Sequence, residues 1–420
     1  MNRSLRWHVV IGGFLAYMFD AVEISILAIS LPAIRASTGI SLFEGGMLAT
    51  TSWVGIGVSG LAMGVVADTY GRRRALLASL AVFAIATFAF AFSAASFSTM
   101  LAARFVAGLG LGGVWAIVAA YVAETWAPER RGRITLLVLS SYPVGAALAA
   151  AIGGRMLPDW HSVFMLCGGA AAIPFLYIAI FIPESPAWLE DARLRLGRRQ
   201  ARRDGVPSPR AWTEIFRGGL LRQTVFGTLA ATLALFAYIS LLTWLPSYLT
   251  SERGLTIGQA SHYVVVFNVG VFASYFLFGY VADRAGERIA LVVSLVGIAI
   301  MLAIYTMVSD PTLLLWISPL MGLFICFAGL LGSYFSHIYP IRIRTTGAGF
   351  CFNVGRGIAS FSPLLMAGFA AHYGLALALQ GCAFIFVLAA LAVLCLPRAG
   401  AAETGRGIDE TAILGPEVTT

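Results

Sequence analysis

The chain contains twelve long apolar runs, and this feature restricts its fold more than any other. Each run has about 20 residues or more, enough to cross a hydrocarbon layer about 30 Å thick as an α-helix. Inside lipid the backbone must satisfy its own hydrogen bonds, and a helix does so within one segment. We therefore expect an all-α membrane protein with twelve transmembrane helices. The runs cover residues 8–31, 44–66, 75–94, 98–123, 134–156, 161–182, 223–249, 261–281, 289–308, 311–335, 346–370 and 375–396.

The composition excludes a soluble globular protein. Hydrophobic residues make up 59% of the chain and charged residues only 11%, against about 45–50% and about 25% in globular domains. The net charge of +8 falls mainly in the polar loops, where it orients a membrane protein, so we expect no nucleic-acid partner. The cysteines show no metal-ligand spacing, and we expect neither a metal nor another cofactor.

The arginines set the predicted orientation, since the chain contains no lysine. With the N-terminus in the cytoplasm, the arginines at 72–74, 130–133, 183–222, 284–288 and 342–344 all lie on the cytoplasmic side. The outer loops then keep only Arg35, Arg155 and Arg253. This asymmetry follows the positive-inside rule. It predicts a multi-pass protein of the bacterial inner membrane with both termini in the cytoplasm.

The polar stretches predict the domain boundaries. Six apolar runs lie on each side of one long polar segment, so we expect six-helix halves at 1–182 and 223–397. The 183–222 segment, with nine arginines and five acidic residues, reads as a solvated cytoplasmic linker, with a regulatory or lipid-headgroup role as the alternative. Residues 398–420 have few large apolar side chains, and we expect a disordered cytoplasmic tail there.

An internal repeat relates the two halves. A Gly-x-x-x-Asp-x-x-Gly loop occurs at 64–71 and again, 215 residues later, at 279–286. A second pair of segments follows runs four and ten, with Tyr-Val-Ala-Glu opening residues 121–130 and Tyr-Phe-Ser-His opening residues 334–342. Repeats of this kind predict two homologous halves related by an axis along the membrane normal.

These residues resemble the Major Facilitator Superfamily over essentially the whole chain, from about 8 to 397. The duplicated loop, in its first copy followed by Arg72–Arg74, carries the resemblance, with further marks at 104–110, 183–186 and 344–347. Segments 243–249 and 339–356 look like the branch of aromatic-acid, sialate and metabolite proton symporters. The resemblance implies a transporter that works by alternating access, and we expect the monomer to be functional.

Three residues depart from the superfamily pattern. Thr69 stands where the first loop often has a basic residue, Glu287 interrupts the basic run of the second loop, and His337 replaces an expected acidic residue. These departures affect the inner gate of the second half and not the expected fold.

The loop motifs also predict a gate on physical grounds. Asp68 and Asp283, at helix ends beside arginines, can accept hydrogen bonds across the interface between the halves. A basic loop that only fixes topology would explain the arginines but not the glycine and aspartate spacing. The expected gating residues are Gly64, Asp68, Gly71, Arg72, Arg73, Glu124, Arg130, Asp283, Gly286, Arg288, His337, Arg342 and Arg344.

Charged residues inside the apolar runs are candidate coupling groups. Asp20 and Glu23 lie near the middle of run one on the same helix face, where each carboxylate costs at least about 2.5 kcal/mol unless it meets water or a partner. Arg104 lies about 9 Å into run four from its outer end, within reach of Asp20. We expect these three residues to couple protons, with protonation of Asp20 releasing Arg104; a purely structural ion pair is the alternative. The arrangement resembles proton-coupled sugar and acid symporters.

Run eleven offers an anchor for a substrate carboxylate. If Arg104 pairs with Asp20, Arg356 remains, about 15 Å into this run, with Asn353 one turn away. An arginine binds a carboxylate through two parallel hydrogen bonds, so we expect an anionic substrate. The expected binding residues are Arg356, Asn353, Asn268, Tyr142, Trp115, Trp53, Tyr238, Phe267 and Tyr334. Each aromatic residue has helix packing or interfacial anchoring as its alternative role.

The leading functional hypothesis is a proton-coupled importer of a small organic acid, with aromatic carboxylates as one candidate class. A sugar or polyol symporter and an efflux antiporter are the alternatives within the same fold. A membrane sensor without transport activity would not need buried charges in both halves, so it is disfavoured. The sequence has no nucleotide-binding Walker loop and no nucleophile or metal cluster, and we expect neither ATP-driven transport nor an enzyme. The expected partners are the substrate, protons and the lipid bilayer.

Overall fold

The computed structural model describes residues 3–186, 188–190, 214–217, 219–339 and 343–397, and the regular elements in these ranges are helices. The predicted tail and most of the predicted linker lie outside the described residues. The N-terminal helices are α1 (Arg3–Thr38), α2 (Leu42–Tyr70), α3 (Arg72–Phe90), α4 (Phe97–Leu111), α5 (Val114–Thr125), α6 (Pro128–Leu139), α7 (Ser141–Met156), α8 (Trp160–Ala170) and α9 (Ala172–Phe181). The C-terminal helices are α12 (Gly219–Ser251), α13 (Ile257–Ala285), α14 (Glu287–Met307), α15 (Pro311–Leu323), α16 (Phe327–Ile338), α17 (Arg344–Ala359), α18 (Ser362–Tyr373) and α19 (Leu375–Leu394).

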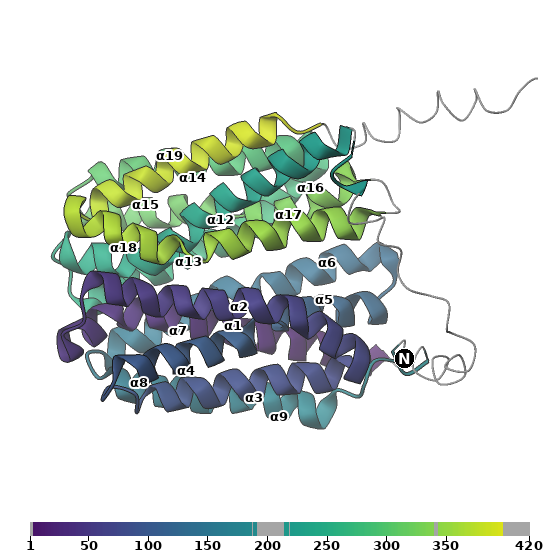
Figure 1. Cartoon of the computed structure of the whole chain (residues 1–420), viewed down its shortest axis with the longest axis horizontal. Helices are drawn as coiled ribbons and strands as arrows, with labels where there is room; N and C mark the ends of the chain where they lie inside the picture. Colours follow the sequence, from purple (N-terminus) through teal and green to yellow (C-terminus); the bar gives the residue numbers. More distant parts are fainter. Residues whose placement is uncertain (1–2, 187, 191–213, 218, 340–342, 398–420) are drawn as a thin grey trace, which may run out of the picture.

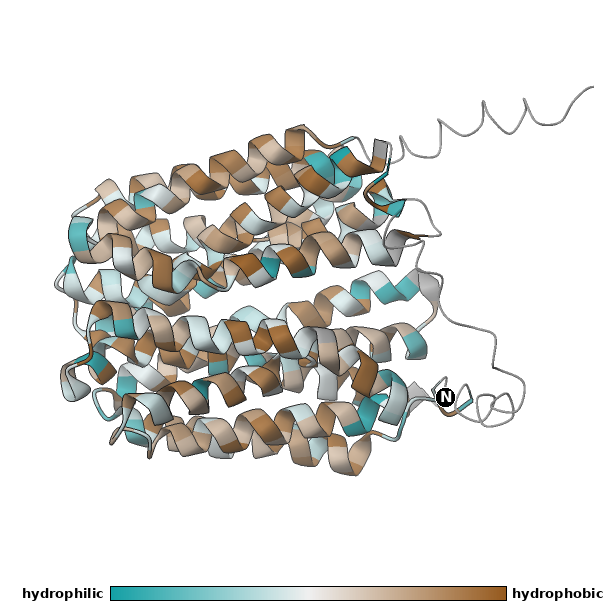
Figure 2. Cartoon of the chain, viewed as in Figure 1, coloured by the Kyte–Doolittle hydropathy of each residue, from teal (hydrophilic) through white to brown (hydrophobic). Residues whose placement is uncertain are grey.

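The expected membrane spans are present. Eleven helices of the described chain are long and apolar enough to cross a membrane, and α2, taken as one span across its bend, makes a twelfth. Several spans consist of two consecutive helices, such as α4 with α5 and α17 with α18. Hydrophobic residues follow the length of the bundle, and hydrophilic residues gather at its two ends (Figure 2). Many large apolar side chains are exposed, including Ile85 and Trp316 at 70% each, as expected for surfaces that face lipid.

The N-terminal and C-terminal helices form two halves that lie side by side, with their axes running in the same general direction (Figure 1). We call the end of the bundle at which α1 begins the inner end, and the opposite end the outer end. The sequence predicts that the inner end faces the cytoplasm.

At the outer end the two halves are in close contact. A Cβ atom at Gly46 of α2 would lie 2.9 Å from the carbonyl oxygen of Pro363 in α18, and one at Gly154 of α7 would lie 2.9 Å from the Ser261 side chain of α13. The backbone N–H of Leu364 also donates to the Thr50 hydroxyl at 3.1 Å. Glycine therefore allows the halves to meet almost backbone to backbone at this end.

Equivalent local features in the two halves confirm the internal repeat. Ser41 and Glu44 form a capping box at the start of α2, and Thr256 and Gln259, 215 residues later, form one at the start of α13. At their inner ends, α2 and α13 stop at Gly71 and Gly286, whose φ values of 110° and 87° favour glycine. The helix turn that each glycine creates begins the inner loop of its half.

Close packing between α2 and α4 positions the arginine of α4. A Cβ atom at Gly108 would lie 2.2 Å from the carbonyl oxygen of Ser52, so only glycine permits this approach. The Ser59 hydroxyl donates to the Gly108 carbonyl at 3.4 Å across the same contact. Arg104, one turn before Gly108, is thereby held against α2 in the middle of the half.

Candidate functional site

A buried ion pair lies in the middle of the N-terminal half. The Arg104 guanidinium donates through Nη1 to Oε1 of Glu23 at 2.6 Å and through Nε to the Ser52 hydroxyl at 3.0 Å. It also lies over the rings of Phe90 and Phe164, with its Cζ atom 5.4 and 5.9 Å from the ring centroids. Both charged side chains are almost fully buried, at 1% and 3% exposed. The pair therefore joins α1, α2 and α4 inside a dry aromatic environment.

The partner of Arg104 differs from the expected one. The sequence predicted Asp20, whereas the structure places Glu23 against the guanidinium. Glu23 lies three residues further toward the outer end of α1, about 4.5 Å along the helix, and its side chain is longer by one methylene. Arg104 lies in the outer part of its span. Glu23, the carboxylate closer to the outer end, is therefore nearer to Arg104 than Asp20 is.

Asp20 instead faces the opposite half. This carboxylate interacts electrostatically with Arg356 of α17 as well as with Glu23 of its own helix. The Arg356 side chain is half-buried, and its Cζ atom lies 6.0 Å from the ring centroid of Trp53 in α2. The Ser360 hydroxyl, one turn along α17, donates to the Trp53 carbonyl at 3.2 Å and fixes this approach. Arg356 and Asp20 thus interact electrostatically across the two halves.

Aromatic side chains from both halves surround these two residues. The ring of Tyr17 lies 5.1 Å from the ring of Trp115 and 5.4 Å from the ring of Tyr142. Tyr238 of α12 and Tyr275 of α13 approach from the other half and interact electrostatically with Tyr17 and with Tyr142. Tyr17 also interacts electrostatically with Asp20 of its own half and with Arg356 of the other half. The centre therefore presents phenol groups to any ligand bound between the halves.

A cavity adjoins the charged centre on its outer side. It contains about 640 Å³ of atom-free space, part of it continuous with open solvent, and its wall is mostly apolar. Arg104 and Asn268 contribute polar groups, and Trp53 and Phe267 contribute rings. Trp53 thus lines this cavity and its ring also lies 6.0 Å from the Arg356 Cζ atom, whereas Arg356 and Asp20 are not among the lining residues.

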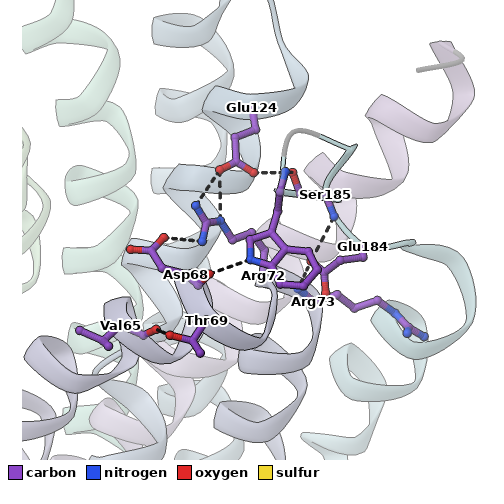
Figure 3. A network of polar contacts seen from close by, with 9 residues as sticks. Val65, Asp68, Thr69, Arg72, Arg73, Glu124, Glu184 and Ser185 are labelled. Atoms are coloured by element: carbon purple, nitrogen blue, oxygen red, sulfur yellow. Dashed lines mark hydrogen bonds and ion pairs between the residues drawn. The ribbon is translucent and has the colours of Figure 1, made fainter. Parts of the chain in front are cut away.

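A polar network ties together helix ends at the inner end of the N-terminal half, and we call it the N-half corner: Asp68, Arg72, Glu124 and Ser185 (Figure 3). Arg72 pairs with Asp68 at 2.5 Å and with Glu124 at 3.0 Å. Glu124 also accepts from the Ser185 hydroxyl at 2.5 Å. The network therefore connects α2, α3 and α5 with the segment that follows α9.

The segment after α9 adds two contacts to this corner. Glu184 accepts a hydrogen bond from the backbone N–H of Arg73 at 2.9 Å, at the start of α3 (Figure 3). A Cβ atom at Gly71 would lie 2.2 Å from the Glu184 carboxylate, so this seat requires glycine. The Trp188 indole N–H donates to the Asp68 carbonyl at 2.8 Å. The beginning of the predicted linker is therefore attached to the N-terminal half.

The C-terminal half has a smaller network in the equivalent place, and we call it the C-half corner: Glu287, Ser333 and His337. The His337 ring nitrogen Nδ1 lies 2.8 Å from the Glu287 carboxylate, which also accepts from the Ser333 hydroxyl. Arg288 donates to the Leu394 carbonyl at the end of α19. This corner connects the start of α14 with the end of α16.

The comparisons with known proteins agree with this architecture. The sequence pattern of the Major Facilitator Superfamily matches residues 13–266, more than half of the chain. The chain belongs to the Major Facilitator Superfamily. A putative metabolite transport protein of Haemophilus influenzae is 27% identical over 94% of this chain and 96% of its own length. The cis,cis-muconate transport protein of Acinetobacter baylyi is 28% identical over 88% and 89%. The crystal structure of a D-xylose-proton symporter superposes with a TM-score of 0.75 at 16% identity over 94% of this chain and 99% of that chain.

Family and architecture together give the general function. This member of the Major Facilitator Superfamily is a multi-pass membrane transporter and not an enzyme. Among the residues described here, no group of three or more His, Cys, Asp or Glu side chains could hold a metal ion. The chemistry of the site therefore consists of binding, charge compensation and conformational change.

Some predicted binding residues of this superfamily member lie outside the centre. Tyr334 is fully buried near the end of α16 and donates to the Pro397 carbonyl at 2.5 Å, so the structure does not bring it to the cavity. Asn268 is buried, and its Nδ2 donates to the Val264 carbonyl at 2.8 Å. Asn353 is exposed one turn before Arg356, and its Nδ2 donates to the Gly349 carbonyl at 2.9 Å.

The predicted gating residues differ in their contacts. Asp68 belongs to the N-half corner and pairs with Arg72 of its own half, not across the halves as expected, whereas Asp283 is exposed at the end of α13. Arg130 is exposed near the start of α6, and Gly64 lies within α2. Arg342 lies outside the described residues, and of Arg344 the structure describes only the backbone, which begins α17.

Sequence reasoning also missed several residues. Tyr17 lies one turn before Asp20 on the same face of α1, and this spacing was a usable signal for it. Tyr275 and Ser52 had no comparable signal, because each is recognised only through residues distant in the sequence. Glu184 stood inside a motif that marked the family, but its position at the start of α3 required the structure.

Proposed function

We propose that this transporter imports a small organic anion together with a proton, by alternating access. The observation that carries the proposal is the electrostatic interaction between the buried Asp20 of one half and the half-buried Arg356 of the other, which packs near Trp53 in the wall of the cavity. A guanidinium at this depth needs an anionic partner, and a substrate carboxylate is suited to its fork of donors.

The arrangement of charges explains how proton and substrate are coupled. Glu23 and Arg104 compensate each other inside the N-terminal half. Arg356 compensates Asp20 while the site holds no substrate. When a substrate carboxylate takes over Arg356, an ionised Asp20 is left without a cation in a medium of low dielectric constant. Protonation of Asp20 removes this charge, so anion and proton enter as an electroneutral pair.

The relatives support an anionic substrate. One relative bears the name of a cis,cis-muconate transport protein, and muconate is a dicarboxylate. The D-xylose-proton symporter shares the fold, and its name joins a proton to a neutral sugar. The aromatic rings of Tyr17, Trp115 and Tyr142 suit a flat or conjugated acid.

The orientation is part of the proposal. We infer that both termini and the 183–222 segment face the cytoplasm of a bacterial cell and that the monomer carries out transport. The arginine asymmetry supports this orientation. A protease-cleavable tag inserted near Ser208 should be cleaved in inverted vesicles and protected in intact cells. Cleavage in intact cells would reverse the orientation.

A transport assay tests the function. The purified protein is reconstituted into liposomes with a neutral interior and an acidic exterior, and uptake of labelled aromatic and aliphatic carboxylates, neutral sugars and organic cations is compared. We expect a carboxylate to accumulate, and a protonophore to abolish the accumulation. Uptake of a sugar alone would favour the sugar symporter. Efflux of a cation in exchange for protons would favour the antiporter.

A further inference from the structure

The two corners occupy equivalent places in their halves. Tyr121 donates to the carbonyl of Pro183 after α9, and Tyr334 donates to the carbonyl of Pro397 after α19. Arg73 donates to the Ala179 carbonyl and Arg288 to the Leu394 carbonyl, and in this pair both donor and acceptor are 215 residues apart. By these matching bonds, Arg72 of the N-terminal half is equivalent in position to Glu287 of the C-terminal half. Glu124 is likewise equivalent to His337.

The corners carry opposite polarity. In the N-half corner the cation, Arg72, begins the helix after the glycine turn, and the anion, Glu124, lies in the last turn of α5. In the C-half corner the anion, Glu287, begins α14, and the basic group, His337, lies in the last turn of α16. Glu287 and His337 each depart from the superfamily pattern when considered alone. Together they form an acid–base pair whose polarity is the reverse of the Arg72–Glu124 pair.

Helix dipoles favour the exchanged polarity. An anion is stabilised at a helix N-terminus and a cation at a helix C-terminus, and Glu287 and a protonated His337 satisfy both conditions. Arg72, a cation at the N-terminus of α3, and Glu124, an anion at the C-terminus of α5, each have the charge that the helix dipole disfavours. Additional partners compensate in the N-half corner, because Asp68 pairs with Arg72 and Glu184 supplies an anion at the start of α3. The C-half corner relies mainly on the charge of one imidazole.

Charged residues occur in helices packed against α16 and in the segment that precedes Glu287. Glu287 and Arg288 lie in α14, Arg222 in α12, and Asp283 and Arg284 at the end of α13. Arg284 stacks on Tyr280 with its Cζ atom 4.5 Å from the ring centroid, and Tyr334 lies one turn before His337 on α16. Arg344 begins α17. Among the groups for which the structure describes a contact with His337, Glu287 is the charged one.

We propose that the C-half corner is a pH-responsive tie between α14 and α16, and that its N-half counterpart is not. An arginine keeps its charge at every physiological pH, whereas a histidine changes charge between about pH 5 and 8. At acidic pH, His337 and Glu287 form an ion pair that holds the inner end of α16. At alkaline pH a neutral hydrogen bond remains, and the end of α16 loosens. If the proposed orientation holds, cytoplasmic acidity tightens this corner.

Amide hydrogen exchange of the full-length protein in lipid nanodiscs tests the tie without any substrate, so its outcome is independent of the proposed transport function. After correction for intrinsic exchange rates, protection at residues 334–338 should fall about two- to fivefold between pH 5.5 and pH 8, as suits a half-exposed pair. Protection at residues 121–125 of α5 should change much less. His337→Gln should show the lower protection at every pH.

The variant that decides the matter copies the polarity of the N-half corner. Glu287→Arg combined with His337→Glu replaces the titrating pair with a permanently charged one, and protection at 334–338 should become independent of pH. Persistence of the pH effect in this double variant or in His337→Gln would overturn the proposal. So would an equal pH effect at 121–125 in the unmodified protein.

Discussion

The two halves treat their membrane-embedded arginines in opposite ways. Arg104 is buried, and its partners, Glu23, Ser52 and two phenylalanine rings, all come from the N-terminal half. Arg356 is half-buried, and its described partners, Trp53 and Asp20, belong to the other half. A charge satisfied within one half can stay fixed while the halves move. If the proposed alternating-access cycle holds, a charge satisfied across the halves exchanges partners in each cycle.

This contrast separates a structural arginine from a working one. Removal of one member of a buried ion pair leaves an uncompensated charge, which typically costs about 3–5 kcal/mol. Removal of the half-buried Arg356 leaves Asp20, a buried carboxylate that can be neutralised by taking up a proton. The following predictions test the contrast from its largest effect to its smallest.

The largest effect should be on folding. Arg104→Leu leaves the Glu23 carboxylate buried without a cation, so we expect the free energy of unfolding to fall by about 3–5 kcal/mol, whereas Arg356→Leu should lower it by less than about 1 kcal/mol. Denaturant unfolding in mild detergent measures both values. Adding Glu23→Gln to Arg104→Leu removes the stranded charge and should restore part of the stability. Equal losses in the two single variants would erase the distinction.

The next effect should be on substrate affinity. Arg356→Ala removes two charge-assisted hydrogen bonds and should raise the Kd for the transported acid at least about 100-fold, or close to 3 kcal/mol. Arg356→Lys keeps the charge but loses the fork, so its effect should be smaller, about tenfold. Equilibrium binding of labelled acid measures both. Arg155→Ala, which removes an exposed outer arginine, is the matched control. Normal binding by Arg356→Ala would exclude the anchor.

A smaller effect should separate the two carboxylates. With a pH gradient of one unit, electroneutral symport of one proton and one anion accumulates the acid about tenfold, equivalent to about 1.4 kcal/mol. Asp20→Asn should reduce this accumulation to none while exchange of internal for external substrate continues. Net uptake under the pH gradient and exchange of internal for external substrate are both measured in the same liposomes. If Asp20→Asn accumulates the acid as the unmodified protein does, Glu23 becomes the proton carrier.

The smallest effect should distinguish the corners. Glu184→Gln removes the anion at the start of α3, where Arg72 already opposes the helix dipole, and should lower the free energy of unfolding by about 0.5–1 kcal/mol. Glu190→Gln, which changes an exposed glutamate of the same segment, is the control and should change it by much less. Equal losses in the two variants would mean that Glu184 contributes only as a surface charge.

The sequence predicted the spans well because hydrophobic length alone identifies a membrane helix. The depth of Asp20, Glu23, Arg104 and Arg356 in the membrane stays a prediction, obtained by counting residues along each helix. The sequence could not decide which carboxylate meets Arg104, because that depends on side-chain reach and on the packing of α2 against α4.

Two other outcomes show the same limit. Tyr334 was predicted to contact substrate from its place in an apolar run, but its hydroxyl is directed to a backbone carbonyl at the end of the chain's last span. Glu287 and His337 each departed from the expected pattern, and only their contact across 50 residues of sequence shows that they compensate each other. Contacts between distant segments are not encoded in any local pattern.

The exchanged polarity of the corners has a historical consequence. If the halves descend from one duplicated gene, the ancestral pair had one polarity, and one copy later reversed it through two separate codon changes. Starting from the Arg72–Glu124 arrangement, a first change of the arginine would set two glutamates against each other, whereas a first change of the acid to histidine would leave a group that can shed its proton. Only the second order avoids an ancestor with two fixed like charges. That order would leave a histidine facing a glutamate, which is the pair found at positions 337 and 287.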